Sequence, residues 1–241
     1  MSSRRLPFDS AVATGRGDDG TTGLLFGGDR IRKDDPRAEA FGTIDEAVAA
    51  LGLARAELGM KAVYGVLTPS LGGLSDLVLR LQRELFVVAA ELATNPSARD
   101  KAEDGRTRVS EAMVDAVGAI LAEVEANVDL PTEFVVAGET RTSASLELAR
   151  TILRRAERRA VTLQTADLLP PGSWAVPYLN RAADLLWVLA RAAEQAEARR
   201  APAATTATRA PATRRDPSAT GRNAPAASAG RPSASTSARS R

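Results

Sequence analysis

Two segments of this chain carry residues whose types and spacing could bind a polyphosphate. The first, TGRGDDGTTGLLFGGDRIRKDD, begins at Thr14 and combines several glycines with three threonines, followed by Lys33. Glycines let backbone N–H groups converge on an anion, threonine hydroxyl groups add donors, and lysine supplies positive charge. The pattern is not a Walker A motif, because no GK[ST] follows the glycines, and no strand precedes it as in a dinucleotide fingerprint. A phosphate-binding loop and a ligand-free terminal segment both remain open.

The second segment, SLELARTILRRAERRAVTL, has the spacing of a helix that buries one face. Successive helical residues lie about 100° apart, which places Arg155 and Arg159 on the far side of this helix. Arg150, Arg154 and Glu157 fall at or just beyond the edge of the buried seam, so we expect these three charges to be half-buried. The seam recurs at intervals of three and four residues: Leu146, Ala149, Leu153, Ala156, Ala160 and Leu163.

Half-buried guanidinium groups need partners, and the sequence leaves two kinds open. Without a partner such a group costs several kcal/mol, so it meets a carboxylate, a phosphate or a neighbouring subunit. Glu157 lies within helical reach of Arg154 and could also serve Arg150. A charged face with internal ion pairs therefore stands beside an anion-binding face.

The last helix, in YLNRAADLLWVLARAAE, repeats this design. Its seam is formed by Leu179, Ala183, Leu186, Ala190 and Ala193. Asn180, Asp184, Trp187 and Arg191 share a neighbouring face at i, i+4, i+7 and i+11. An amide, a carboxylate and a guanidinium on the flank of a buried helix suggest contact with another helix or a ligand, although Asp184 could simply pair with an arginine of the chain.

The elements that must position these side chains are helices. Each apolar stripe can be buried only against another helix, which predicts an all-α, five-helix bundle. Residues 95–106 and the break at 129–131 are predicted loops, and 133–136 is a short apolar connector or a fragment of strand. The first predicted helix starts just after Pro36. The other four run from about Pro69 to Thr94, Thr107 to Asn127, Thr142 to Gln164, and Trp174 to Arg199.

Composition supports this organisation and excludes several kinds of site. The 241 residues are 44% hydrophobic, enough for a continuous core, and contain no cysteine and no histidine. Disulfides, thiolate or imidazole metal sites and Ser-His-Asp triads are therefore excluded. No secretory leader and no apolar stretch of about 18 residues is recognisable, so we expect a soluble, cytoplasmic protein without a membrane span.

Composition and helical patterning divide the chain into three predicted regions. These are an irregular N-terminal segment (1–35), the bundle (36–199) and a disordered tail (200–241) rich in Ala, Pro, Ser, Thr and Arg. Residues 201–241 hold seven arginines and one aspartate, which leaves 25 basic and 29 acidic residues before them. The tail is either inert or a weak electrostatic tether to a polyanion. Because the remainder is net acidic, nucleic-acid binding is not expected of the bundle.

Several blocks, in this order, resemble one family. The blocks GDDGTTGLLFGG, KDDPR, EAFGTIDE, FVV, ARTILRRAERR and YLNRAADLLWVLAR are similar to those of the PduO-type ATP:cob(I)alamin adenosyltransferases over about residues 14–195. The resemblance implies a ferritin-like five-helix bundle that assembles as a homotrimer, with ATP and the corrinoid bound between subunits. It also implies partnership with a cobalamin reductase and an adenosylcobalamin-dependent mutase.

The resemblance also implies roles for individual residues. Arg154 would contact phosphate, and Asp45 would form an intersubunit ion pair with Arg150; these three form the catalytic group. Phe134 and Asp184 would lie at the corrinoid, with Phe134 covering its lower face. The ATP site would comprise Thr14, Gly15, Gly17, Asp18, Gly20, Thr21, Thr22, Lys33, Arg154, Glu157 and Asn180.

The implied reaction is attack of Co(I) on the 5′ carbon of ATP, which forms a cobalt–carbon bond and releases triphosphate. Co(I) is itself a strong nucleophile, so the absence of histidine and cysteine fits. The protein must position the reactants and neutralise the leaving triphosphate, with Mg²⁺ bound through the ATP phosphates.

Two departures from the family pattern fall near the corrinoid side. Ala137, Gly138 and Glu139 stand where members usually have Pro-Gly-Gly, and Glu147 stands where they often have histidine. The alternative function is that of a non-catalytic corrinoid carrier or sensor, or a helical scaffold, with the same fold. A carrier needs no triphosphate site, so the loop, Lys33 and the arginines favour the enzyme.

Overall fold

The computed structural model of this protein describes residues 10–60, 66–68 and 71–199. Five α-helices lie within these ranges: α1 (Pro36–Met60), α2 (Leu74–Leu92), α3 (Glu111–Glu125), α4 (Arg141–Thr165) and α5 (Ala175–Ala198). A 3₁₀ helix, η1 (Pro96–Lys101), follows α2. Two antiparallel ladders pair β1 (Thr21–Thr22) with β2 (Ile31–Arg32) and β3 (Val66–Thr68) with β4 (Gly72–Gly73). The predicted tail, 200–241, lies outside the described residues.

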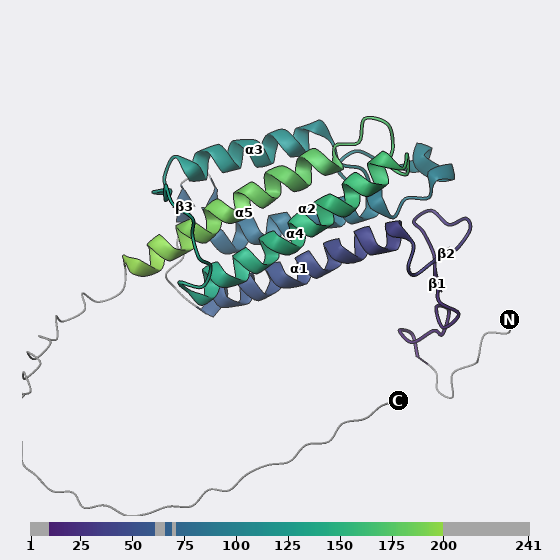
Figure 1. Ribbon diagram of the computed structural model, residues 1–241, viewed down its shortest axis with the longest axis horizontal. Coiled ribbons are helices and arrows are strands. Elements are labelled where there is room, and N and C mark those ends of the chain that lie inside the picture. Colours follow the sequence, from purple (N-terminus) through teal and green to yellow (C-terminus); the bar gives the residue numbers. More distant parts are fainter. Residues whose placement is uncertain (1–9, 61–65, 69–70, 200–241) are drawn as a thin grey trace, which may run out of the picture. The chain divides into compact units, whose positions relative to one another are not determined.

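The helices form the predicted all-α bundle, which confirms the fold class. Helix α1 lies against α2 and α4, and α5 lies against α3 and α4. Figure 1 shows β1 and β2 beside the end of the bundle where α1 begins. Asp35 starts α1, because its Oδ1 accepts a hydrogen bond of 2.9 Å from the backbone N–H of Arg37. The N-terminal loop is thus joined directly to a capped helix.

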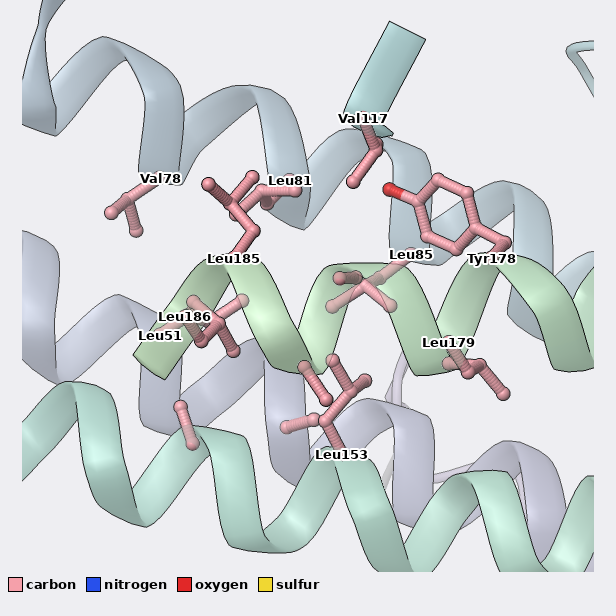
Figure 2. Close-up of a cluster of buried hydrophobic side chains, with 14 of the residues drawn as sticks. Leu51, Val78, Leu81, Leu85, Val117, Leu153, Tyr178, Leu179, Leu185 and Leu186 are labelled. Carbon is pink, nitrogen blue, oxygen red and sulfur yellow. The ribbon is translucent and has the colours of Figure 1, made fainter. Parts of the chain in front are cut away.

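The core is made by the seams that the periodicity predicts. All six seam residues of α4 and all five of α5 are buried. Figure 2 shows α5 at the centre of this core, with Leu185 and Tyr178 near α2 and Leu153 of α4 on the opposite side. Shortening Leu153 to alanine would cost about 2–5 kcal/mol of unfolding free energy, because the surrounding helices cannot fully close the cavity.

Two helices start later than predicted, and local hydrogen bonds explain both differences. Helix α2 starts at Leu74 rather than near Pro69, because Gly72 has a φ of 70° and pairs with β3. Helix α3 starts at Glu111 rather than Thr107, because the backbone N–H of Val109 is used by the Glu91 carboxylate at 2.6 Å. The predicted loop at 95–106 contains η1, whose first turn is capped by the side chain of Asn95.

The apolar connector at 133–136 is neither strand nor helix. Phe134 is fully exposed and Val136 is 89% exposed. No helix of the described residues is long and apolar enough to cross a membrane.

Candidate active site

The N-terminal loop is a set of tight turns held together by one arginine. Arg30 donates from Nε to Thr21 Oγ1 at 2.7 Å and from Nη2 to the carbonyl oxygens of Arg16 and Thr21, at 2.8 and 2.9 Å. Gly15 and Gly20 have φ values of 68° and 79°, which side-chain-bearing residues rarely adopt. The sequence contains no periodic signal for this role of Arg30.

Acidic residues of the loop contribute to the same turns. Asp19 Oδ1 accepts hydrogen bonds from the backbone N–H of Thr21 at 2.9 Å and from its hydroxyl group at 2.7 Å. These bonds lower the pKa of the Asp19 carboxyl, so it stays ionised. Asp18 is exposed, and its backbone N–H donates to Gly15 O at 3.2 Å. Thr14 is exposed, and Thr22 pairs with Ile31 in the β1–β2 ladder.

Lys33 lies directly over the glycines. Its backbone N–H donates to Gly20 O at 2.9 Å, and a Cβ atom added to Gly17 would lie 3.0 Å from Lys33 Nζ. Gly17 therefore leaves the space into which the lysine amino group extends. The structure thus brings together Gly17, Gly20, Thr21 and Lys33, as the sequence predicts for a phosphate-binding loop.

The loop is attached to the end of α2. Leu25 N–H donates to Ala93 O at 2.8 Å, and Asn95 N–H donates to Leu25 O at 3.2 Å. The Asn95 side chain donates to Gly27 O at 2.6 Å, and a Cβ atom at Gly28 would lie only 2.0 Å from Asn95 Nδ2. Asn95 therefore fixes the loop to the bundle. The sequence alone places Asn95 only at the start of a predicted loop, 95–106.

A second candidate region is a surface hollow of about 380 Å³ between α3, α4 and α5, here called the arginine hollow, which is lined by two arginines and two carboxylates. It brings together Arg150, Arg154 and Asp184, three of the predicted site residues. Arg154 is exposed rather than half-buried as expected, and its guanidinium has no hydrogen bond or ion pair among the described residues. The hollow is lined by Leu121, Glu125, Leu130, Arg150, Arg154, Ala183, Asp184, Trp187 and Val188.

The local ion pairs differ from those that helical spacing suggested. Glu157 serves neither Arg150 nor Arg154; its Oε1 accepts a hydrogen bond of 3.1 Å from Asn180 Nδ2. Arg150 instead donates from Nε to Glu147 at 2.6 Å. Asp184 is half-buried and, within the described chain, has no arginine within ion-pair distance. Glu157 and Asn180 are thus adjacent, as expected for two residues of one nucleotide site.

Two arginines predicted on the far side of α4 contact a neighbouring helix. Arg155 pairs with Glu46 of α1, and Arg159 pairs with Glu39 of α1 at 3.3 Å. Both side chains are away from the buried seam, as predicted, and are 41% and 48% exposed. The spacing within α4 did not indicate their partners, because α1 covers α4 as well as α5 does. These two arginines join α4 to α1.

Two further predicted residues, Asp45 and Phe134, are exposed at the surface. Asp45 is exposed on α1 and, in the described ranges, makes no hydrogen bond or ion pair. Phe134 is fully exposed and does not line the arginine hollow. No hydrogen bond or ion pair connects the loop with the hollow across the residues that the structure describes. The loop and the arginine hollow are therefore not joined by polar contacts within the described part of the chain.

Chemically, the two regions offer cations and backbone donors but no resident metal site. Among the described residues, no group of three or more histidine, cysteine, aspartate or glutamate side chains could hold a metal ion. Mg²⁺ commonly binds through one or two carboxylates together with substrate phosphates. The donor set therefore fits a magnesium ion that arrives with a nucleotide.

Comparison with known proteins agrees with these features. The sequence matches the family described as cobalamin adenosyltransferase over residues 12–193, which include the loop, α4 and most of α5. A corrinoid adenosyltransferase of Citrobacter freundii is 34% identical over 183 residues, 76% of this chain and 94% of that protein. One of Bacillus subtilis is 35% identical over 179 residues, 74% of this chain and 83% of that protein.

The fold has solved counterparts as well. A variant PduO-type ATP:corrinoid adenosyltransferase from Lactobacillus reuteri, complexed with cobalamin and ATP, is 25% identical with a TM-score of 0.62. The match covers 76% of this chain and 93% of that one. The chain belongs to the cobalamin adenosyltransferase family.

Proposed function

We infer that this protein transfers the 5′-deoxyadenosyl group of ATP to the Co(I) centre of a reduced corrinoid. Co(I) supplies the electron pair of the new cobalt–carbon bond, and the C5′–O bond breaks with its electron pair going to the triphosphate. The observation that carries this inference is that a lysine-bearing glycine loop and an arginine hollow both occur in a chain of this family. The reaction needs no protein nucleophile, because Co(I) is itself a strong nucleophile.

In this proposal the loop binds the triphosphate. Thr14, Gly15, Gly17, Asp18, Gly20, Thr21 and Thr22 surround it, and Lys33 supplies a positive charge. The position of Lys33 Nζ, 3.0 Å from where a Gly17 Cβ would stand, supports this role. Backbone donors and a cation that are already in place stabilise negative charge as it develops on the leaving group. Mg²⁺ enters bound to the ATP phosphates.

The hollow supplies the other half of the site. Arg154 contacts a phosphate group, and Glu157 and Asn180 complete the nucleotide site. The hydrogen bond between Glu157 and Asn180 supports their joint role, because it fixes a carboxylate and an amide of two helices beside each other. Asp184 and the exposed Phe134 contact the corrinoid, with the aromatic ring over its lower face.

The active site is completed by a second copy of the chain, in a homotrimer. Within the described residues of one chain, the loop and the hollow have no hydrogen bond or ion pair between them. Asp45 is exposed without a described partner, and the terminal nitrogens of Arg150 are likewise unbonded in the described chain. An ion pair between Asp45 of one subunit and Arg150 of the next would satisfy both and place one loop over the neighbouring hollow.

A single assay separates this enzyme from a non-catalytic corrinoid carrier or scaffold. The full-length protein is supplied with ATP, Mg²⁺ and chemically reduced cobalamin, and the absorbance spectrum is followed for adenosylcobalamin. We expect adenosylcobalamin to form, with one molecule of triphosphate released for each molecule of adenosylcobalamin. A protein that binds the corrinoid but forms no adenosylcobalamin would contradict the enzyme and favour the non-catalytic carrier. In a cell, a reductase must supply Co(I), and an adenosylcobalamin-dependent mutase would consume the product.

A further inference from the structure

A row of charged side chains leads from the interior of the bundle to the arginine hollow. Glu147 Oε2 accepts a hydrogen bond of 2.6 Å from Arg150 Nε, and Glu147 Oε1 lies 3.3 Å from Arg191 Nη2. Arg191 Nη2 also reaches Glu194 Oε1 at 3.0 Å. The side chains of Arg191 and Glu147 are only 3% and 7% exposed, whereas that of Arg150 is 26% exposed. The row therefore ends at the one member that lines the hollow.

Stability alone is a poor explanation for this arrangement. Arg191 Nε and Nη1 are buried without a hydrogen-bond partner among the described residues. The ring of Trp187, 5.7 Å from Arg191 Cζ, compensates only in part. Removing two charges from water is costly, and a well-packed apolar pair of similar size is often as stable or more so. A role at the hollow explains the costly pair better.

The geometry restricts Arg150 in a specific way. Glu147 binds Arg150 through Nε, so the two terminal nitrogens of its guanidinium stay available at the hollow for the proposed ion pair with Asp45 of the next subunit, which aligns that subunit's loop. The other Glu147 oxygen is held by Arg191 from α5, so the carboxylate cannot turn with Arg150. The guanidinium of Arg150 is therefore held from behind by two helices.

We propose that Glu147 and Arg191 are positioning residues that fix the guanidinium of Arg150 at the arginine hollow. Neither residue lines the hollow, and both act through Arg150. This inference rests on the proposed function, because adenosyl transfer is its principal readout. It assigns a purpose to Glu147, the residue that stands where relatives often have histidine.

The decisive variant pair separates positioning from folding. Glu147→Gln alone leaves the buried Arg191 with Glu194 as its only carboxylate partner among the described residues and should lower the melting temperature. Glu147→Gln combined with Arg191→Met removes both deeply buried charges and leaves only Glu194, whose side chain is 15% exposed, without Arg191. We therefore expect most of the lost melting temperature to return. Arg150 still lacks its carboxylate, so we expect kcat/KM for ATP to stay roughly tenfold or more below wild type. Activity that returns together with the melting temperature would overturn the proposal.

A double-mutant cycle tests whether Glu147 acts through Arg150. If it does, Glu147→Gln combined with Arg150→Lys should be within about twofold of Arg150→Lys alone in kcat/KM. Losses that multiply would show independent roles and overturn the proposal. Tyr178→Phe is the control for destabilisation, because it removes a buried hydrogen bond of 2.7 Å to Glu84 and should leave kcat and KM unchanged.

The same variants distinguish this inference from the proposed function. A wild-type protein that forms no adenosylcobalamin contradicts the proposed function. The positioning role is then read from the dissociation constant for ATP·Mg²⁺. We expect the Glu147→Gln, Arg191→Met protein to bind ATP·Mg²⁺ roughly tenfold more weakly than wild type. Equal affinities, or no ATP binding by the wild-type protein, would overturn it.

Discussion

The N-terminal loop and the arginine hollow both present cationic side chains beside carboxylates, but the two regions are held in place by different means. The loop is shaped by hydrogen bonds between exposed groups, chiefly those of Arg30, and is attached to the bundle through Asn95. The hollow is built on α3, α4 and α5, whose seams are buried. A change in the loop should thus affect ATP binding with little effect on stability, whereas changes behind the hollow should affect both.

The largest effect is expected at the hollow, from Arg154→Ala. Arg154 is exposed without a described partner, so its loss should leave the melting temperature nearly unchanged. If it stabilises charge on the triphosphate, kcat/KM should fall by about 100-fold or more. Steady-state kinetics and thermal unfolding would measure the two quantities. Arg158→Ala, an exposed arginine one turn along α4, is the matched control. Near-normal turnover by Arg154→Ala would remove this residue from the site.

A smaller effect is expected in the loop, from Gly17→Ala. The added methyl group would stand 3.0 Å from Lys33 Nζ and force the lysine amino group to move. We expect KM for ATP to rise roughly tenfold with little change in melting temperature, because the displaced charge binds phosphate less well. At Gly23 a Cβ atom would come no closer than 3.9 Å to another group, so Gly23→Ala should retain the wild-type KM. Equal KM values for the two variants would contradict the role of Lys33.

The sequence predicts the hollow better than the loop because helical periodicity is regular. The seams of α4 and α5, which support the hollow, were predicted from spacing alone, but the meeting of Arg150, Arg154 and Asp184 at one hollow was not. Backbone conformations with positive φ and the clamp by Arg30 follow no period. These two features can be recognised only in the folded structure of the loop.

Pairs between helices were the part that the sequence could not supply. Spacing along α4 suggested an ion pair between Glu157 and an arginine of the same helix. The packing of α4 against α5 instead places Glu157 within hydrogen-bond distance of Asn180. Likewise, the pairing of Arg155 with Glu46 depends on how α1 lies against α4. Arg154 was expected to be half-buried, and its exposure in one chain is what a site shared between subunits requires.

The smallest effect is expected at the end of α2 that holds the loop. Burial raises the pKa of the Glu91 carboxyl, although hydrogen bonds from Ser173 and Val109 oppose this. The folded protein therefore keeps a proton that the unfolded chain has lost, and this contribution to stability is complete below the unfolded pKa, about 4.3. It disappears as the pH rises through the folded pKa.

Glu91→Gln removes this titration. The free energy of unfolding, measured by denaturant at a series of pH values above about 4.3, should fall less steeply with pH than in the wild-type protein. Adenosyl transfer at the hollow should be unaffected. Identical slopes for the two proteins would contradict the raised pKa.

In the proposed homotrimer, one active site combines the loop of one subunit with the arginine hollow of another. Lys33→Ala and Arg154→Ala chains would be co-expressed with different affinity tags, and oligomers containing both would be purified. A cyclic trimer that contains both variants has one interface with two intact halves, so the mixed protein should regain about a third of wild-type adenosyl transfer. Mixed oligomers no more active than either variant alone would contradict a shared site.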